Sequence, residues 1–269
     1  MTRAPLQLSA SLVEKVWGIE RLEPWLRSPG GRIGEVWYAL PEGPCLPILV
    51  KLLFTSDRLS VQVHPDEAYA RAHEGCGGKA EMWYVLAADP GATLALGFLE
   101  PVTRQRARQA AETGEIEQLL RWWPVSAGQV YYVPPGTVHA LGAGVTVCEI
   151  QQNNPITYRL YDYGRPRDLQ LDRAVEALRF QPNPGLLPST GQPLVSCPYF
   201  VVERLEVGSL HYQPDPERFH LLVAIQGTGG IGDASFAPGQ VWYIPPGAEP
   251  FELSAANGRA VFLRTHVPA

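Results

Sequence analysis

Runs of hydrophobic residues along this chain predict a protein built mainly of β-strands. Residues 31–40, GRIGEVWYAL, alternate between apolar and polar positions after a glycine turn, and residues 48–54, ILVKLLF, form a nearly continuous apolar run. Further strands are predicted at residues 81–86, 93–98 and 128–162, where Gly and Pro turns separate short apolar segments. Short strands with frequent turns are typical of antiparallel β-barrels and sandwiches.

Helical periodicity is confined to small parts of the chain. The clearest helical segment is residues 101–123, which we expect to be broken near Gly114. Residues 65–74 begin with proline and acidic residues, as the first turn of a helix often does. A short helix is also predicted near residues 172–178. The pattern therefore favours a β fold with a small helical segment.

One predicted strand, residues 59–64, presents polar side chains on a single face. Ser60, Gln62 and His64 occupy alternate positions, and the positions between them are apolar. Burial of such polar groups is unfavourable unless they bind something. The loop that follows, GGKAE, brings a lysine and the carboxylate of Glu81. We predict that Gln62, His64 and Glu81 belong to a metal site that later parts of the chain complete.

Composition narrows the class of protein. Hydrophobic residues make up 45% of the 269 residues and charged residues 18%, so a substantial core is expected. The net charge of -5 argues against a general nucleic-acid or membrane-surface partner. The sequence contains no long apolar span and no signal-peptide pattern. Its four cysteines lack CxxC spacing, so we expect free thiols and a cytoplasmic location.

Lysine is rare in this chain and arginine supplies most of the positive charge. Only Lys15, Lys51 and Lys79 are present. Lys51 interrupts an apolar strand, so its side chain either reaches the surface or faces a polar cavity. We favour the cavity, because the next strand carries Gln62 and His64. Lys79 lies two residues before Glu81 and is expected beside the same site.

A nine-residue pattern occurs twice. GQVYYVPPG at residues 128–136 recurs as GQVWYIPPG at residues 239–247, which indicates duplication of a β module. We therefore predict one module at residues 1–180 and a second at residues 181–269. After the repeat the first module has His139 and the second has Pro250. We expect the second module to be degenerate and to lack metal ligands.

The first copy resembles a known signature. Its pattern G-x5-P-x-G-x2-H, which ends at His139, is similar to the second motif of the cupin family, and Gln62, His64 and Glu81 stand where the first motif places ligands. Longer stretches resemble the short bacterial class of type I mannose-6-phosphate isomerases: LSVQVHPDEAYA, GGKAEMWYVL, VPPGTVHALGAG and EIQQNNPITYRLYDYGR. The resemblance implies two cupin modules, which are jelly-roll β-barrels.

The resemblance also implies a set of site residues. The metal ligands would be Gln62, His64, Glu81 and His139, holding one zinc ion per chain. The ligand types alone also permit other divalent metals. The resemblance places Glu149 and Arg159 among the catalytic residues. From its position near Glu81 in the sequence we predict Lys79 as a third catalytic residue, and we predict that Ser60 and Lys51 contact the substrate. Glu149 could instead be a buried partner of a cation.

The implied activity is a zinc-dependent aldose–ketose isomerisation. It would interconvert mannose 6-phosphate and fructose 6-phosphate through a cis-enediol, with a small sugar phosphate as the expected partner. The alternatives are a cupin isomerase or epimerase acting on another sugar, and a cupin that binds metal or sugar without catalysis. A glycine-rich phosphate loop of the Walker type is missing from the sequence. Phosphate must therefore be held by scattered cations, Ser60 and main-chain groups.

Overall fold

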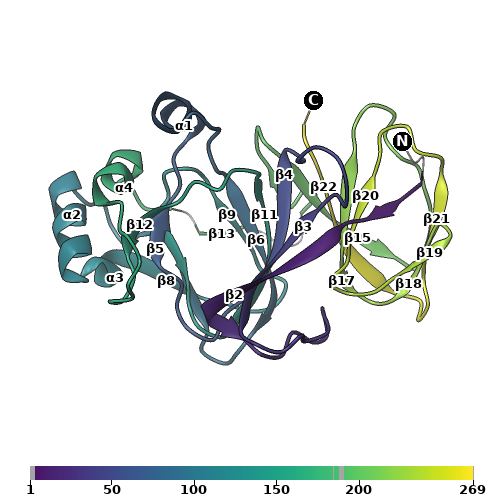
Figure 1. The fold of residues 1–269 in the computed structure, drawn as a ribbon, viewed down its shortest axis with the longest axis horizontal. Coiled ribbons are helices and arrows are strands. Elements are labelled where there is room, and N and C mark those ends of the chain that lie inside the picture. Colours follow the sequence, from purple (N-terminus) through teal and green to yellow (C-terminus); the bar gives the residue numbers. More distant parts are fainter. Residues whose placement is uncertain (1–3, 184, 188–190, 269) are drawn as a thin grey trace. The chain divides into compact units, whose positions relative to one another are not determined.

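The computed structural model describes residues 4–183, 185–187 and 191–268, and these residues are mainly in antiparallel β-strands (Figure 1). The chain divides into two compact units. One comprises Met1–Glu14, Ile19–Leu52 and Thr190–Ala269, and the other comprises Lys15–Gly18 and Leu53–Ser189. The predicted module boundary at residue 181 adjoins residues 184 and 188–190, which lie outside the described part. That boundary stays a prediction.

The unit that contains Leu53–Ser189 is a β-barrel of two antiparallel sheets. One sheet has the strand order β12-β5-β10-β7-β8, and the other includes β13-β9-β6-β11 in that order. Their bounds are β5 Val61–Val63, β6 Glu81–Ala88, β7 Thr93–Phe98, β8 Leu120–Pro124, β9 Val130–Val133, β10 His139–Leu141, β11 Val145–Gln152, β12 Tyr158–Tyr161 and β13 Leu186–Leu187. Alternate residues of these strands, among them Trp83, Val85 and Val147, form a buried apolar core.

Three helices pack together at one end of this unit (Figure 1). They are α2 (Arg104–Thr113), α3 (Ile116–Leu119) and α4 (Leu171–Ala177). A fourth helix, α1 (Glu67–Glu74), begins after Asp66, whose side chain accepts a hydrogen bond from the Tyr69 amide. The alanines of α2 pack against Val61 and Val63, the apolar face of β5. The predicted two-faced strand is thus confirmed, with its polar residues turned away from the helices.

The predicted helix at residues 101–123 is too long. Gly114 ends α2 in the left-handed conformation, as the sequence suggested, but residues 120–124 form a strand. Trp122 and Trp123 pair with Ala95 and Leu94 of β7. Aromatic side chains favour strands. The stretch therefore pairs with β7 as a strand, although its sequence pattern resembles that of a helix.

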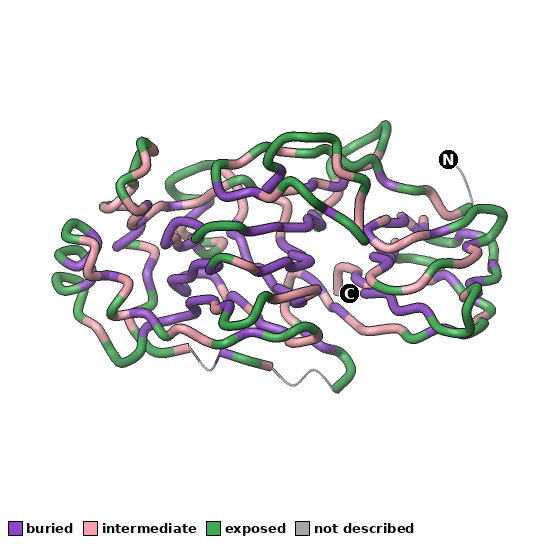
Figure 2. The backbone as a smooth tube through the Cα atoms, turned by 90° about the horizontal axis from the view of Figure 1, so that it is seen from below, coloured by how far each residue is buried: buried purple, intermediate pink, exposed green. Residues whose placement is uncertain are grey.

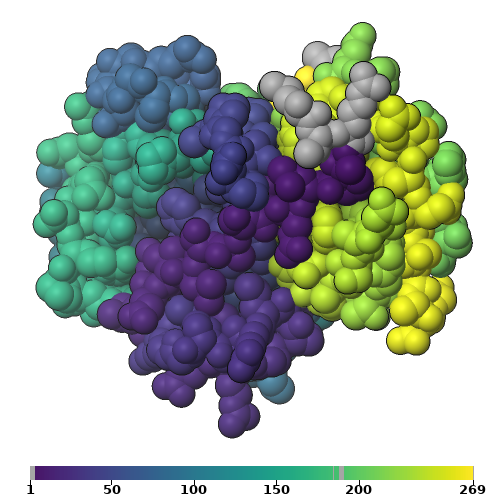
Figure 3. Space-filling model, turned by 45° about the vertical axis from the view of Figure 1, so that its right-hand side comes forward, coloured from purple at the N-terminus to yellow at the C-terminus, as the bar shows by residue number. Residues whose placement is uncertain are grey.

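The other unit contains a second pair of antiparallel sheets. Their strand orders are β1-β20-β17-β22-β15-β14 and β16-β21-β18-β19, and β2 pairs with β3. The bounds are β1 Leu6–Gln7, β2 Ser9–Ile19, β3 Ile33–Ala39, β4 Ile48–Phe54, β14 Val195–Ser196, β15 Val201–Val207, β16 Ser209–Tyr212, β17 His220–Gln226, β18 Gly229–Ile231, β19 Ala234–Phe236, β20 Val241–Ile244, β21 Phe251–Ala255 and β22 Ala260–His266. The chain's N-terminal strand lies on the C-terminal strands (Figure 3), because β1 pairs with β20.

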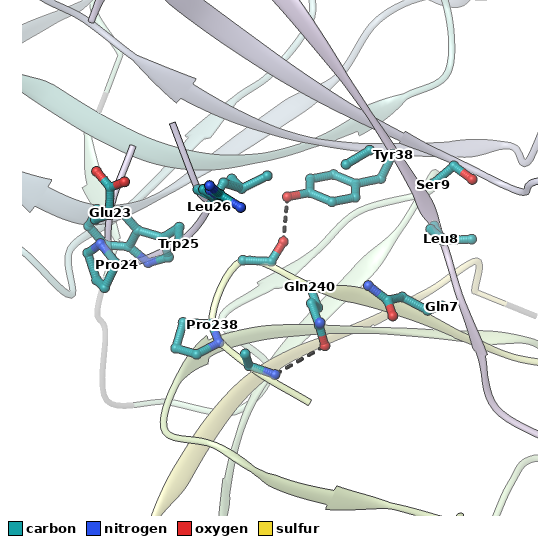
Figure 4. A pocket seen from close by; sticks show the side chains of 14 residues that line it. Gln7, Leu8, Ser9, Glu23, Pro24, Trp25, Leu26, Tyr38, Pro238 and Gln240 are labelled. Carbon is teal, nitrogen blue, oxygen red and sulfur yellow. Dashed lines mark hydrogen bonds between the residues drawn. The ribbon is translucent and has the colours of Figure 1, made fainter. Parts of the chain in front are cut away.

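A cavity of about 810 Å³ opens in this same unit between the loop near Trp25 and the turn before β20 (Figure 4). The turn is held by the Tyr38 hydroxyl, which donates to the Gly239 carbonyl. The loop approaches so closely that a Cβ on Gly239 would lie 2.0 Å from the Trp25 carbonyl oxygen. The residues that line this cavity include none of the predicted site residues.

Burial follows the strands in both units: strands such as β4, β11 and β17 are buried along most of their length, and loops are mostly exposed (Figure 2). The four cysteines are free thiols, as expected. In the described part of the chain, every helix is too short or too polar to cross a lipid bilayer.

Candidate metal centre

Three side chains from distant parts of the sequence meet at one end of the barrel core. His64 follows β5, Glu81 begins β6 and His139 begins β10. All three are at most 1% exposed, and one ligand atom from each lies within 4.8 Å of the other two. Glu81 shares its strand face with Trp83 and Val85 of the core, since residues two apart point the same way. The predicted grouping of His64, Glu81 and His139 is therefore confirmed as a possible metal site.

Each histidine is oriented by a main-chain carbonyl. Nδ1 of His64 lies 2.9 Å from the Ile156 carbonyl oxygen, and Nδ1 of His139 lies 2.9 Å from that of Thr137. When these nitrogens carry the protons, the Nε2 lone pairs are left for a metal. Nε2 of His64 lies 3.1 Å from Glu81 Oε1, and Nε2 of His139 lies 3.7 Å from Oε2.

Burial keeps both imidazoles neutral. It lowers the pKa of His64 to about 3 and also lowers the pKa of His139. Because a metal binds only the unprotonated ring nitrogen, both histidines are ready to act as ligands at neutral pH.

The Glu81 carboxylate is ionised although it is fully buried. Burial alone would raise its pKa, but His64, which is protonated only at low pH, and the Lys79 ammonium hold the pKa well below its usual range. Lys79 Nζ lies 2.8 Å from Oε1. Even so, neither carboxylate oxygen receives a well-directed hydrogen bond from any residue that the structure describes. A buried carboxylate beside two imidazole lone pairs fits a divalent cation.

Gln62 lies against this group. Its partner across the β5–β10 pair is His139, and its amide Nε2 is 3.2 Å from His139 Nε2. The Ser60 hydroxyl donates to Gln62 Oε1 at 3.4 Å. A half-turn of the amide would direct its oxygen toward the imidazoles, so Gln62 as a fourth ligand stays a prediction that its position allows.

The loop that carries Lys79 is clamped by three polar side chains. The Glu67 carboxylate accepts from the Gly78 amide at 2.8 Å, and Gln152 Oε1 accepts from the Ala80 amide at 2.8 Å. Asn154 Nδ2 donates to the Gly78 carbonyl at 2.8 Å. A Cβ on Gly78 would lie 2.6 Å from the Glu67 amide nitrogen, so the loop requires glycine there. The clamp sets where the Lys79 ammonium points.

Trp83 is a site residue that the sequence analysis did not identify. Its indole Nε1 donates to Glu149 Oε2 at 2.9 Å, and its ring packs edge-on against His139 with centroids 5.5 Å apart. Trp83 and Glu149 are partners across β6 and β11. The signal available was the spacing of two residues between Glu81 and Trp83, which places both on one strand face.

Arg159 lies on β12 opposite Gln62. Its Nη1 donates to the Asp168 carbonyl at 3.1 Å, while its buried Nε has no partner among the described residues. Burial and then the charge of Arg167 lower the pKa of Arg159. The guanidinium therefore keeps a donor available for an anionic group.

Lys51 belongs to β4 in the unit that contains Ile19–Leu52. Its side chain is buried, and Nζ lies 4.6 Å from the centroid of the Trp37 ring. This cation–π contact accounts for the burial of a lysine within an apolar strand. A contact between Lys51 and substrate stays a prediction.

Comparison with known proteins identifies the family. No protein-family model matches the chain. The chain is 33% identical to mannose-6-phosphate isomerase of Streptococcus mutans over 84% of its length and 86% of the relative, and 30% identical to mannose-6-phosphate isomerase ManA of Bacillus subtilis over 94% and 96%.

Solved structures agree with the sequence relatives. A crystal structure of mannose 6-phosphate isomerase from Bacillus subtilis superimposes with a TM-score of 0.86 at 27% identity, covering 98% of this chain and all of that one. The apo phosphomannose isomerase of Salmonella typhimurium shares the fold, with a TM-score of 0.74 at 15% identity over the whole of both chains. With relatives at 30% identity or more over most of their length, this chain belongs to the mannose-6-phosphate isomerase family of cupin-fold enzymes.

Proposed function

We propose that this enzyme interconverts mannose 6-phosphate and fructose 6-phosphate at the cluster of Gln62, His64, Glu81 and His139, with one zinc ion bound there. The observation that carries the proposal is the fully buried Glu81 carboxylate, with two oriented imidazoles and the Lys79 ammonium around it. The substrate in this proposal, mannose 6-phosphate, is taken from the names of the related proteins.

The reaction moves a proton between C1 and C2 of the sugar through a cis-enediol. A bound divalent ion would supply Lewis-acid stabilisation of the negative charge that develops on the two sugar oxygens. The chain itself contributes a second positive charge, since the Lys79 ammonium is buried within the same group. Burial strengthens this electrostatic stabilisation because water does not screen it.

Two groups are placed to handle protons and charge near the cluster. Glu149 is 4% exposed and one of its oxygens is held by Trp83, so it is a positioned carboxylate suited to general acid–base work. Arg159, whose Nε has no partner among the described residues, is suited to an anionic oxygen of the substrate. Ser60 lies beside Gln62 and offers a hydroxyl to the same side. We propose Lys79, Glu149 and Arg159 as the catalytic residues.

The proposal is tested by assaying fructose 6-phosphate formation from mannose 6-phosphate. We expect activity in the metal-replete protein, loss after chelation, and recovery when zinc is restored. Glucose 6-phosphate serves as a matched substrate that differs only at C2. Inactivity of the metal-replete protein on mannose 6-phosphate would refute the substrate, and full activity after verified removal of metal would refute the role of zinc.

A cytoplasmic location is part of the same proposal. It is supported by four free thiols in the described structure and by a phosphorylated sugar as the substrate.

A further inference from the structure

The duplicated frame allows positions in the two β modules to be matched residue by residue. Val133 and Ile244 are the sixth residues of the two nine-residue repeats. Val133 pairs with Glu81 in one module, and Ile244 pairs with His220 in the other. His220 therefore stands where the first module has Glu81.

A main-chain hydrogen bond fixes a second pair of equivalent positions. The amide of Gly136, the last residue of the first repeat, donates to the His64 carbonyl at 2.7 Å. The amide of Gly247, the last residue of the second repeat, donates to the Asp215 carbonyl at 2.9 Å. Asp215 therefore corresponds to His64. In the second module, His220 and Asp215 therefore occupy positions equivalent to Glu81 and His64 of the first metal cluster. Histidine and aspartate are both residue types that bind metals.

His266, on the neighbouring strand β22, lies opposite His220. In the first module Gln151 pairs with Glu81. In the second module Leu221 pairs with Thr265, so the next position along each strand brings His266 opposite His220. The rings of His220 and His266 lie with centroids 5.5 Å apart, compared with 4.8 Å for His64 and His139. The spacing of the second imidazole pair thus approaches that of the first.

Both imidazoles have a nitrogen suited to a metal. His220 is 7% exposed, and its Nδ1 lies 2.6 Å from the Tyr212 hydroxyl, which fixes the orientation of the ring. Tyr212 is held in turn by stacking on Phe251, with centroids 5.0 Å apart. Nδ1 of His266 is buried and has no partner among the described residues. Burial lowers the pKa of both histidines, so both are neutral at pH 7.

We propose that His220 and His266 form a second, weaker zinc site in the C-terminal β module. It is a two-imidazole site with water in the remaining positions, because among the described residues only His64, Glu81 and His139 place three such ligand atoms together. Asp215 is engaged by Arg218, whose Nη2 lies 2.7 Å from its carboxylate. The sequence alone predicts that the second module lacks metal ligands, and the proposed site departs from that prediction.

Two ion pairs lie beside the histidines. Arg264 faces both histidines but is paired with Glu203, with Nη2 2.6 Å from the carboxylate. Arg218 is similarly neutralised by Asp215. Each arginine is thus paired with a carboxylate. Imidazole ligands favour zinc, copper and nickel over magnesium or calcium, so zinc alone is an appropriate probe.

The test uses protein in which the first site is disabled. The variant His64→Ala, His139→Ala is stripped of metal, dialysed against zinc, and analysed for bound zinc together with its far-ultraviolet circular dichroism. We expect about one zinc per chain. Adding His266→Ala should remove it, whereas adding His211→Ala should not, because His211 is an exposed histidine of the same module that pairs with Glu252. Adding Tyr212→Phe should weaken binding by about tenfold.

A second readout covers the case in which a histidine variant does not fold. The imidazole proton signals of His220 and His266 are followed by nuclear magnetic resonance in the His64→Ala, His139→Ala protein as zinc is added. Selective shifts of these two signals support the site. The site is refuted if this protein retains no zinc, if the His266→Ala variant retains as much zinc as the His211→Ala variant, or if zinc leaves both signals unchanged. None of these outcomes depends on isomerase activity, so the test is independent of the proposed function.

Discussion

At the scale of residues, the alternation of polar and apolar positions pointed to Gln62 and His64. Glu81 was placed by the loop that follows them, and His139 by the resemblance of the first repeat to a cupin motif. The carbonyls that orient the imidazoles could not be predicted, since the Ile156 carbonyl reaches His64 only through a fold that joins residues 92 positions apart. Trp83 was missed because its bond to Glu149 depends on the register of β6 and β11.

Replacing Lys79 with methionine should separate metal binding from turnover. The variant keeps the length of the side chain but removes the ammonium that lies 2.8 Å from Glu81. We expect zinc content to be retained and kcat to fall by about 10²–10⁴-fold, the range typical of a positioned proton-transfer or electrostatic group. Zinc analysis and steady-state kinetics on one preparation measure both. An unchanged kcat would remove Lys79 from the catalytic residues.

The thiols should differ sharply in reactivity. Cys45 is exposed, whereas Cys148 is fully buried and burial raises the pKa of its thiol. Because the thiolate is the reactive form, we expect iodoacetamide to modify Cys45 in the folded protein and Cys148 only after unfolding. Peptide mass spectrometry after timed alkylation measures this. Modification of Cys148 at the rate of Cys45 would contradict the buried position of β11.

At the scale of elements, strands were predicted better than the helix ends. The apolar runs at residues 48–54 and 93–98 correspond to β4 and β7. Residues 120–123 were wrongly assigned to a helix, because their strand conformation depends on pairing with distant residues of β7. The clamp on the Lys79 loop was equally hidden, since Glu67 and Gln152 meet only in the fold.

The clamp can be tested at Glu67. The Glu67→Ala variant leaves the Gly78 amide without its acceptor, so we expect the free energy of unfolding to fall by about 1–3 kcal/mol and kcat to fall while zinc is retained. Glu67→Gln keeps an acceptor oxygen and should recover part of both losses. Glu112→Ala is a suitable control, because Glu112 only pairs with Arg108 on an exposed face. Equal effects of Glu67→Ala and Glu112→Ala would show that the clamp does not position Lys79.

Gly78 offers an independent test of the same loop. An added Cβ would lie 2.6 Å from the Glu67 amide nitrogen and 2.7 Å from the Asp66 carbonyl carbon, which are main-chain atoms that cannot turn aside. Gly78→Ala should therefore displace Lys79 and lower kcat, and we expect a loss of stability of about 1–3 kcal/mol. Gly75→Ala provides a comparison in which no atom lies within 4 Å of the added Cβ, although its positive φ adds local strain. Wild-type kinetics for Gly78→Ala would contradict the close packing.

At the scale of the whole molecule, duplication was visible from the sequence but the composition of the two units was not. The repeat at residues 128–136 and 239–247 predicted two β modules. The pairing of β1 with β20 could not be predicted, because β1 is only two residues long and its partner lies more than 230 residues away. Long-range pairing of so short a strand leaves no pattern in the sequence.

Metal removal should destabilise the unit that contains Leu53–Ser189. A ligand that binds only the folded state adds about 4 kcal/mol of stability when its concentration is a thousand times its Kd. We expect chelation to lower the Tm of the wild-type protein and zinc to restore it. The His64→Ala, His139→Ala variant should show little of this response, with only the weaker second site remaining. An identical zinc-dependent shift of Tm in the variant and the wild type would contradict the assignment of the main site.

The central claim is that His64, Glu81 and His139 hold the catalytic ion. It is tested most directly by X-ray diffraction from crystals of the active, zinc-loaded enzyme, with data collected on both sides of the zinc absorption edge. We predict an anomalous peak at about 2.0–2.2 Å from an Nε2 of each histidine and from an oxygen of Glu81. An active crystal without a zinc peak among these three side chains would contradict the account.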